Sequence, residues 1–171
     1  LDYVFTLRDD IYFHESEVFG SQRSRKVVAA DFVYSFNRLI DPELASPGGW
    51  VLQNVKDYYA KDNLTLVIRM HKSFPAFLGL LSMRYCSVVP HEAVTQQGAQ
   101  FRKRPIGTGP FQFQFWEEDV KLVLRKNPQF YEKDELGIPL PYLESIAIQF
   151  IPDIQSEFML FLQGKLDFLN S

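Results

Sequence analysis

The sequence predicts a mixed α and β domain, because segments with the two-residue period of a strand alternate with segments that have the period of a helix. Apolar side chains alternate with others over residues 64–70, which is the clearest strand pattern. Over residues 29–40 they fall instead on one stripe of a helix. A further strand pattern at 111–125 is interrupted by three acidic residues, which predicts the turn of a β-hairpin.

The first forty residues are predicted to form a strand, a loop and a helix. Alternation over residues 3–8 predicts a strand with one buried face, and the pattern resumes at 11–13. Residues 15–26 are rich in serine and basic residues without a period, which predicts an exposed loop. Asp31 lies near the amino end of the helix that follows, where a negative charge is favourable, and the helix is expected to end at Asp41-Pro42.

The middle of the chain contains two further short helices and two breaks. The segment 45–49, Ala-Ser-Pro-Gly-Gly, predicts a flexible break. Helical spacing recurs at 74–81 and again at 91–97, where Gly98 is a suitable left-handed cap. The polar connector at 102–105 is the predicted boundary between two subdomains, at 1–105 and 106–171.

The last third of the chain is predicted to contain three strands and a helix. The hairpin pairs a strand at 111–116 with one at 120–125. After a segment rich in proline and glycine, alternation at 146–150 predicts another strand. An apolar stripe at 154–162 predicts the final helix, with Gly164 as its cap.

Composition excludes several classes of protein. The 171 residues carry 18 Lys and Arg against 21 Asp and Glu, a net charge of −3, which argues against nucleic acid as a partner. The single cysteine cannot form an internal disulfide or a Cys-x-x-Cys site. The 46% hydrophobic content argues against disorder. No apolar run approaches the ~18 residues that span a bilayer. Because the chain starts at Leu1 and holds 16 Phe, we expect a Phe-rich segment of a longer protein.

Candidate catalytic and metal sites are few. Gly107-Thr108-Gly109 would suit a phosphate-binding loop only if it opened a helix, whereas Pro110 and a strand pattern follow it. A Cys86–His91 nucleophile pair is available, although a cysteine in an apolar stretch is commonly a packed hydrophobic residue. The three histidines, at 14, 71 and 91, are too dispersed to predict a metal site. We therefore predict no enzyme, no metal and no cofactor.

Two aromatic residues are candidates to contact a ligand. Most phenylalanines lie on strand or helix stripes and are expected in the core, whereas Trp50 and Tyr85 lie next to breaks. The basic clusters at 23–26 and 102–104 lack interleaved aromatics and are interpreted as solvated loops. The absence of a catalytic constellation favours a binding role.

The order of these segments resembles a known family, the peptide and nickel solute-binding proteins of bacterial ABC importers. Residues 31–42, DFVYSFNRLIDP, are similar to its ADDVVYSFNRLLDP helix, and 106–111 match its PIGTGPF signature. The resemblance extends over the whole chain, with two differences: His14 is followed by Glu-Ser and a longer basic loop, and Tyr131 replaces a tryptophan. Further matching segments, in order, are 3–8, 13–14, 116, 122–128 and 163–167.

The resemblance implies a fold like that of type II periplasmic binding proteins, with mixed or antiparallel sheet and short helices. This chain would supply part of the first of two lobes: a small subdomain at 1–105 and the beginning of the main sheet subdomain at 106–171. Closure of two lobes on a ligand is a hinge motion that the ligand's bridging contacts bias. The second lobe, which would supply many charged contacts to a peptide, is not in this sequence.

The resemblance also implies a function and candidate residues. The protein would bind a peptide or similar small solute outside the cytoplasm, with or without a lipid anchor, and deliver it to permease subunits. The alternative is the ligand-sensing domain of a bacterial transcription regulator. Candidate ligand-contacting residues are Gly48, Trp50, Tyr85, Asn170 and Ser171, where Gly48 stands in place of an aromatic residue of related binders. The structural family signature comprises Gly107, Thr108, Gly109, Pro110 and Phe111.

Overall fold

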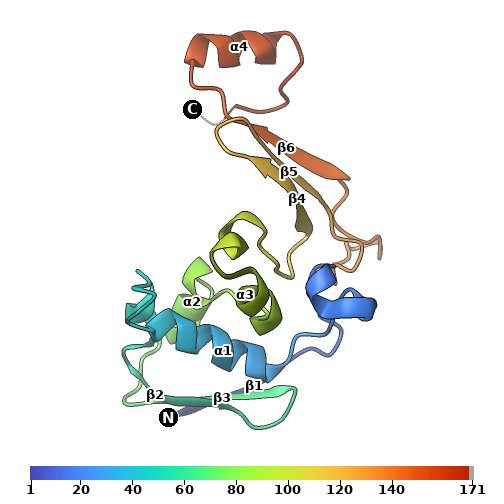
Figure 1. Ribbon diagram of the computed structural model, residues 1–171. Helices are drawn as coiled ribbons and strands as arrows, with labels where there is room; N and C mark the ends of the chain where they lie inside the picture. Colours follow the sequence, from blue (N-terminus) through green and yellow to red (C-terminus); the bar gives the residue numbers. More distant parts are fainter. Residues whose placement is uncertain (170–171) are drawn as a thin grey trace.

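The computed structural model describes residues 1–169 and contains two three-stranded antiparallel sheets (Figure 1). The first sheet comprises β1 (Asp2–Thr6), β2 (Val55–Ala60) and β3 (Thr65–Met70) in the order β1-β3-β2. Since β3 pairs with a strand on either side, it is the most enclosed strand of this sheet. Its Ile68 is completely buried, and Val67 on the opposite face is buried as well.

Helix α1 (Ala29–Ile40) packs on the first sheet and forms the main core with it (Figure 1). Its apolar stripe places Phe36 and Leu39 inward, as the spacing predicts, whereas Ile40 at the end of the stripe is half exposed. The helix begins as expected, since the Asp31 carboxylate accepts a hydrogen bond of 2.9 Å from the Val28 N–H. This main core also contains Ala29, Val51, Leu52, Leu66, Ile68, Met70, Phe77 and Cys86.

Short helices complete the first region of the molecule, residues 1–105. Among the described residues these are α2 (Phe77–Leu81), α3 (His91–Gln97) and four short 3₁₀ helices, Glu17–Gln22, Gly49–Leu52, Arg84–Cys86 and Gly98–Lys103. Gly98 ends α3 with a φ of 53°, a conformation that suits glycine. A second, smaller core lies between α3 and the segment that follows β1, and it contains Phe13, Val27, Ala93 and Ile106.

The second sheet is built from β4 (Phe111–Glu117), β5 (Lys121–Lys126) and β6 (Ser145–Gln149), in chain order. Helix α4 (Ile154–Leu162) follows and lies at the end of this sheet that is remote from the first sheet (Figure 1). The predicted hairpin and helix are therefore confirmed. Helix α4, however, buries none of its residues, so its predicted stripe does not form a core within the described residues.

One strand was not predicted and two local predictions were wrong. Strand β2 was not predicted, since a register shift between Val55 and Asp57 breaks its alternation. Residues 11–13 form only an isolated bridge, from Tyr12 to Lys26. In β4 the buried side chain is Gln112 and not its phenylalanine neighbours, because Gln112 lies at the wall of a cavity between α3 and β4 and donates a hydrogen bond to the Lys126 carbonyl.

Candidate functional site

Gly48 and Tyr85 meet beside the carboxyl end of α1. After α1 ends, the chain turns and enters the 3₁₀ helix at 49–52, whose Val51 and Leu52 are buried in the main core. This anchoring holds Gly48 against Tyr85: a Cβ added at Gly48 would lie 2.5 Å from Tyr85 Cγ and 2.6 Å from Tyr85 Cβ. Non-bonded carbon atoms do not approach so closely. The tyrosine ring therefore occupies the space that a side chain at position 48 would need.

A cavity of about 360 Å³ opens beside Tyr85. Arg38 and Leu39 of α1 line one side, and Phe101 contributes a further apolar surface. Ser46 and Ser87 also line it, but the Ser87 hydroxyl already donates to the Arg84 carbonyl at 2.8 Å. The cavity thus combines apolar walls with one cationic side chain, which is the usual character of a small-molecule site.

The other candidate ligand residues are not brought to this cavity. Trp50 does not line it, and its side chain is 46% exposed on the surface nearby. Asn170 and Ser171 lie outside the described residues. Of the five candidates, the structure therefore brings together only Gly48 and Tyr85.

The segment Gly107-Thr108-Gly109-Pro110-Phe111 joins the two regions and is held by His14. The backbone N–H of His14 donates to the Gly107 carbonyl at 2.8 Å, and the backbone N–H of Gly107 donates to the His14 ring at Nδ1, at 3.2 Å. Because Nδ1 accepts, the ring proton is on Nε2, which donates to the Gly109 carbonyl at 2.9 Å. Asn127, the residue that follows β5, donates to the same carbonyl at 2.9 Å. The segment enters a strand and not a helix, so it is a structural joint.

The environment of His14 favours its neutral form. The imidazole is buried, and burial lowers the pKa of His14, opposed by the hydrogen bond to the Gly109 carbonyl. Protonation would also place an N–H at Nδ1 opposite the Gly107 N–H. The joint is therefore built around an uncharged histidine.

A larger cavity of about 710 Å³ lies between α3 and β4, next to this joint. Its lining is polar and includes several glutamines, among them Gln97 and Gln112. Two buried polar atoms at its wall, Gln97 Oε1 and Trp116 Nε1, have no hydrogen-bond partner within residues 1–169. The cavity shares none of its lining residues with the smaller one beside Tyr85.

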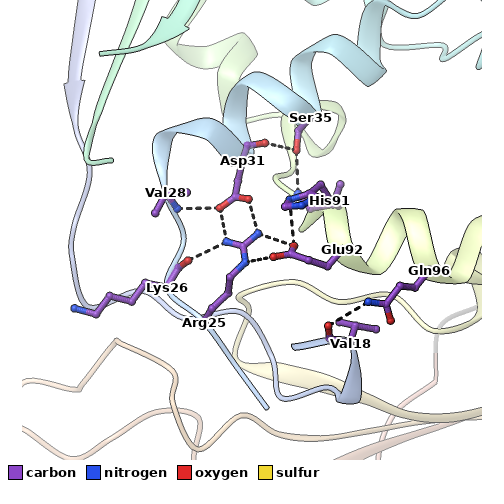
Figure 2. A network of polar contacts seen from close by, with 10 residues as sticks. Val18, Arg25, Lys26, Val28, Asp31, Ser35, His91, Glu92 and Gln96 are labelled. Atoms are coloured by element: carbon purple, nitrogen blue, oxygen red, sulfur yellow. Dashed lines mark hydrogen bonds and ion pairs between the residues drawn. The ribbon is translucent and has the colours of Figure 1, made fainter. Parts of the chain in front are cut away.

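Arg25 forms an ion network that the sequence analysis missed (Figure 2). Its guanidinium makes paired hydrogen bonds to Asp31 of α1, at 2.7 and 2.9 Å, and to Glu92 of α3, at 2.6 and 2.7 Å. Although burial acts against the charged form, the hydrogen bonds to Asp31 and Glu92 raise the pKa of Arg25, and Arg25 in turn lowers the pKa of Glu92. The interpretation of 23–26 as a solvated loop was therefore wrong for Arg25, which connects α1 with α3.

The candidate nucleophile pair is not assembled. Cys86 is buried in the main core, its sulfur lies 3.8 Å from the Leu80 carbonyl, and burial raises the pKa of its thiol. His91 lies against Tyr34 and Glu92 instead. Over residues 1–169 the structure contains no group of three His, Cys, Asp or Glu side chains that could hold a metal ion. None of the described helices is long and apolar enough to cross a membrane.

Comparison with protein families gives one match that covers all of residues 1–171, to the model described as "Bacterial extracellular solute-binding proteins, family 5 Middle". Among curated proteins, the chain is 29% identical over 149 residues to di/tripeptide-binding protein 2 of Pseudomonas aeruginosa. It is 31% identical over 149 residues to the probable di/tripeptide-binding protein 5 of the same organism. These alignments cover 77% of this chain but only 27% and 28% of the relatives, so the chain spans less than a third of their length.

Solved structures show the same arrangement of elements. The periplasmic binding protein DppA of Helicobacter pylori, in complex with the peptide STSA, matches 97% of this chain and 34% of its own, with a TM-score of 0.82 and 25% identity. MoaA of Agrobacterium, in complex with mannopinic acid, matches 98% of this chain and 31% of its own, with a TM-score of 0.80 and 27% identity.

Proposed function

Because the chain belongs to the family 5 bacterial extracellular solute-binding proteins, we propose that it is part of the substrate-binding component of a peptide-type ABC importer. The protein binds a peptide or similar small solute reversibly, outside the cytoplasm, and delivers it to permease subunits. The observation that carries this proposal is the match to the family over the entire chain, together with relatives that are named as di- and tripeptide-binding proteins. Those relatives are binding proteins and not regulators, which supports import over ligand sensing.

The fold agrees with this role. Mixed α and β structure with antiparallel sheets and short helices is confirmed, and the structural neighbours are periplasmic binding proteins of the type II class. Within this fold we assign residues 1–105 to a small subdomain and 106–171 to the start of the main sheet subdomain. The burial pattern supports that division, because both core clusters lie within residues 13–106.

Within the small subdomain, the cavity beside Tyr85 is the proposed ligand-contacting surface. Gly48 leaves room for the Tyr85 ring, so Tyr85 supplies here the aromatic contact that related binders place at position 48. Trp50, Asn170 and Ser171 remain further candidates for ligand contact. Binding is proposed to be non-covalent, since Cys86 is buried in the main core and His91 lies against Tyr34 and Glu92 instead.

The test is equilibrium binding by the full-length gene product, measured by calorimetry with pools of dipeptides, tripeptides and longer peptides. We expect saturable binding of at least one pool by the wild-type protein. Tyr85→Ala should weaken that binding by about tenfold, the loss of one buried aromatic contact. Tyr142→Ala, which changes an exposed tyrosine in the second region, is the matched control and should bind as wild type. If no pool binds to or thermally stabilises the wild-type protein, the proposal fails.

A further inference from the structure

Arg38 lines the cavity beside Tyr85 with its guanidinium unpaired. It is partly buried, and no carboxylate lies within 4 Å of it in the described part of the chain. The guanidinium makes no hydrogen bond there either, and its recorded neighbour is the Tyr34 ring, with 5.9 Å between Cζ and the ring centroid. A guanidinium carries five N–H donors, and leaving such donors unpaired while they are partly removed from water is unfavourable.

Other arginines of the same region show the contrast. Arg25 pairs with two carboxylates, Arg69 lies 3.5 Å from Asp2 and from Asp57, and Arg8 pairs with Asp10. These pairs form although Arg8 and Arg69 are more exposed than Arg25. Among the described residues Arg23, Arg84 and Arg104 also lack a carboxylate within 4 Å, and of these arginines only Arg38 lines the cavity beside Tyr85.

A second unpaired arginine reinforces the positive charge at this place. The Arg84 guanidinium lies 5.7 Å from the centroid of the Tyr85 ring, and no carboxylate lies within 4 Å of it in residues 1–169. The acidic residues that follow α1, Asp41 and Glu43, form a local turn instead, in which the Asp41 carboxylate accepts from the Glu43 N–H at 2.9 Å. Tyr85 thus lies close to one cationic side chain, Arg84, and lines the same cavity as another, Arg38.

We propose that Arg38 binds a carboxylate of the transported solute, and that the apolar walls of the cavity hold the adjoining part of the molecule. A planar guanidinium matches a carboxylate with two parallel hydrogen bonds, which gives directional recognition. The volume of about 360 Å³ suits a carboxylate with a small apolar body, such as one amino-acid unit. The inference rests on the proposed function for its location, since Tyr85 belongs to the ligand-contacting surface.

A fragment experiment tests this without knowledge of the natural solute. The full-length protein is titrated with 3-phenylpropionate and with its neutral isostere 3-phenylpropionamide, and binding is followed by NMR. For the wild type we expect saturable binding of the carboxylate, with the amide at least tenfold weaker. Arg38→Gln should lose at least tenfold in affinity for the carboxylate and leave the amide unchanged. Arg125→Gln, an exposed arginine of β5, is the matched control and should behave as wild type.

Arg38→Lys keeps the charge but not the paired geometry, and we expect it to show intermediate affinity. Equal binding of the acid and the amide by the wild type overturns the inference, as does undetectable binding of both. This comparison needs no variant, so a folding defect in Arg38→Gln does not obscure it.

A peptide arm separates this inference from the proposed function and identifies the source of the carboxylate. The probes are N-acetyl-trialanine as the free acid, the same peptide as its amide, and acetyl-Ala-Glu-Ala amide. Preference for the free acid assigns the carboxylate to a peptide carboxyl terminus, and preference for the glutamyl peptide assigns it to a side chain. If fragments bind through Arg38 but no peptide binds, the proposed function fails and the carboxylate site stands. If all three peptides bind equally and Arg38→Gln changes nothing, the proposed function stands and the carboxylate site at Arg38 fails.

Discussion

The two regions of the molecule have similar periodic patterns but opposite burial. In residues 1–105 the first sheet is covered by α1, and Phe36 of that helix is only 2% exposed. In residues 106–169 the equivalent helix α4 follows a sheet of the same size, yet its Phe158 is 50% exposed. Apart from Ile106, every buried apolar side chain among the described residues belongs to the first region.

This difference shows that a periodic pattern specifies which side chains share a face, whereas burial requires a second layer to cover that face. The first region contains both layers, so its pattern predicts the core directly. In the second region the described residues supply the sheet and the helix, but α4 lies beyond the end of the sheet instead of on it (Figure 1). This contrast between the two regions can be tested through the stability of the 171-residue chain.

The largest expected effect comes from matched phenylalanine truncations in the two helices. Phe36→Ala should lower the free energy of unfolding by about 3–5 kcal/mol, because it empties a site in the main core. Phe158→Ala should change it by less than about 1 kcal/mol, since the side chain is half exposed. Urea unfolding followed by circular dichroism measures both. Similar losses from the two changes would contradict the assignment of the core to the first region.

The next effect concerns the ion network of Arg25. Arg25→Met leaves the Asp31 carboxylate, which is 3% exposed, without its paired partner, and we expect a loss of about 2–3 kcal/mol. This loss of stability is smaller than the loss expected for a fully buried ion pair, because the Arg25 side chain is 22% exposed. The control is Arg8→Met, which breaks an exposed pair with Asp10 and should cost less than about 1 kcal/mol. Equal melting temperatures for the two variants would refute the structural role of the network.

A smaller effect is expected from alanine at two glycines. Gly48→Ala should destabilise the chain by about 1–3 kcal/mol, because the new Cβ overlaps Tyr85. Gly79→Ala, within α2, meets no atom within 4 Å and should be neutral or stabilising by about 0.5–1 kcal/mol. Thermal melts distinguish the two. A neutral Gly48→Ala would mean that Tyr85 moves freely and does not fill the space.

The smallest effect is a pH dependence at the joint between the two regions. Since burial lowers the pKa of His14, the unfolded chain takes up a proton below about pH 6.5 that the folded chain resists. The contribution of His14 to stability is therefore complete above that pH and is lost as the pH falls below it. Unfolding measured between pH 5 and 8 should show a steeper acid loss for the wild type than for His14→Gln. Parallel curves would exclude a neutral, buried His14.

Local patterns predicted most elements of the fold, and the failures have a common physical cause. The helix at 29–40 and the strand at 64–70 follow from periods within one segment. The pairing of Arg25 with Glu92 spans 67 residues and leaves no local sign, so Arg25 resembles any solvated arginine. The burial of Gln112 depends on its place at the wall of the cavity between α3 and β4 and on its hydrogen bond to the Lys126 carbonyl, which alternation within β4 does not reveal.

The candidate site was predictable only in part. Tyr85 and Gly48 were identified separately, one as an aromatic next to a break and the other through the family resemblance. Their contact arises only in the folded chain, where the start of the 3₁₀ helix at 49–52 lies against the 3₁₀ helix at 84–86. Arg38 lies in α1, but the periodic pattern that predicts this helix consists of its apolar residues and gives no role to Arg38. Its lack of an ion-pair partner within residues 1–169 is a property of the folded structure, and no sequence pattern could have indicated it.

The most direct test of the central claim is hydrogen–deuterium exchange of the full-length protein with and without the peptide that binds it most tightly. If the cavity beside Tyr85 is the ligand-contacting surface of this region, the peptide should slow exchange at 44–50 and 84–89 and leave 145–150 unchanged. Protection that is absent from both of the first two segments, or no bound peptide at all, would contradict the account.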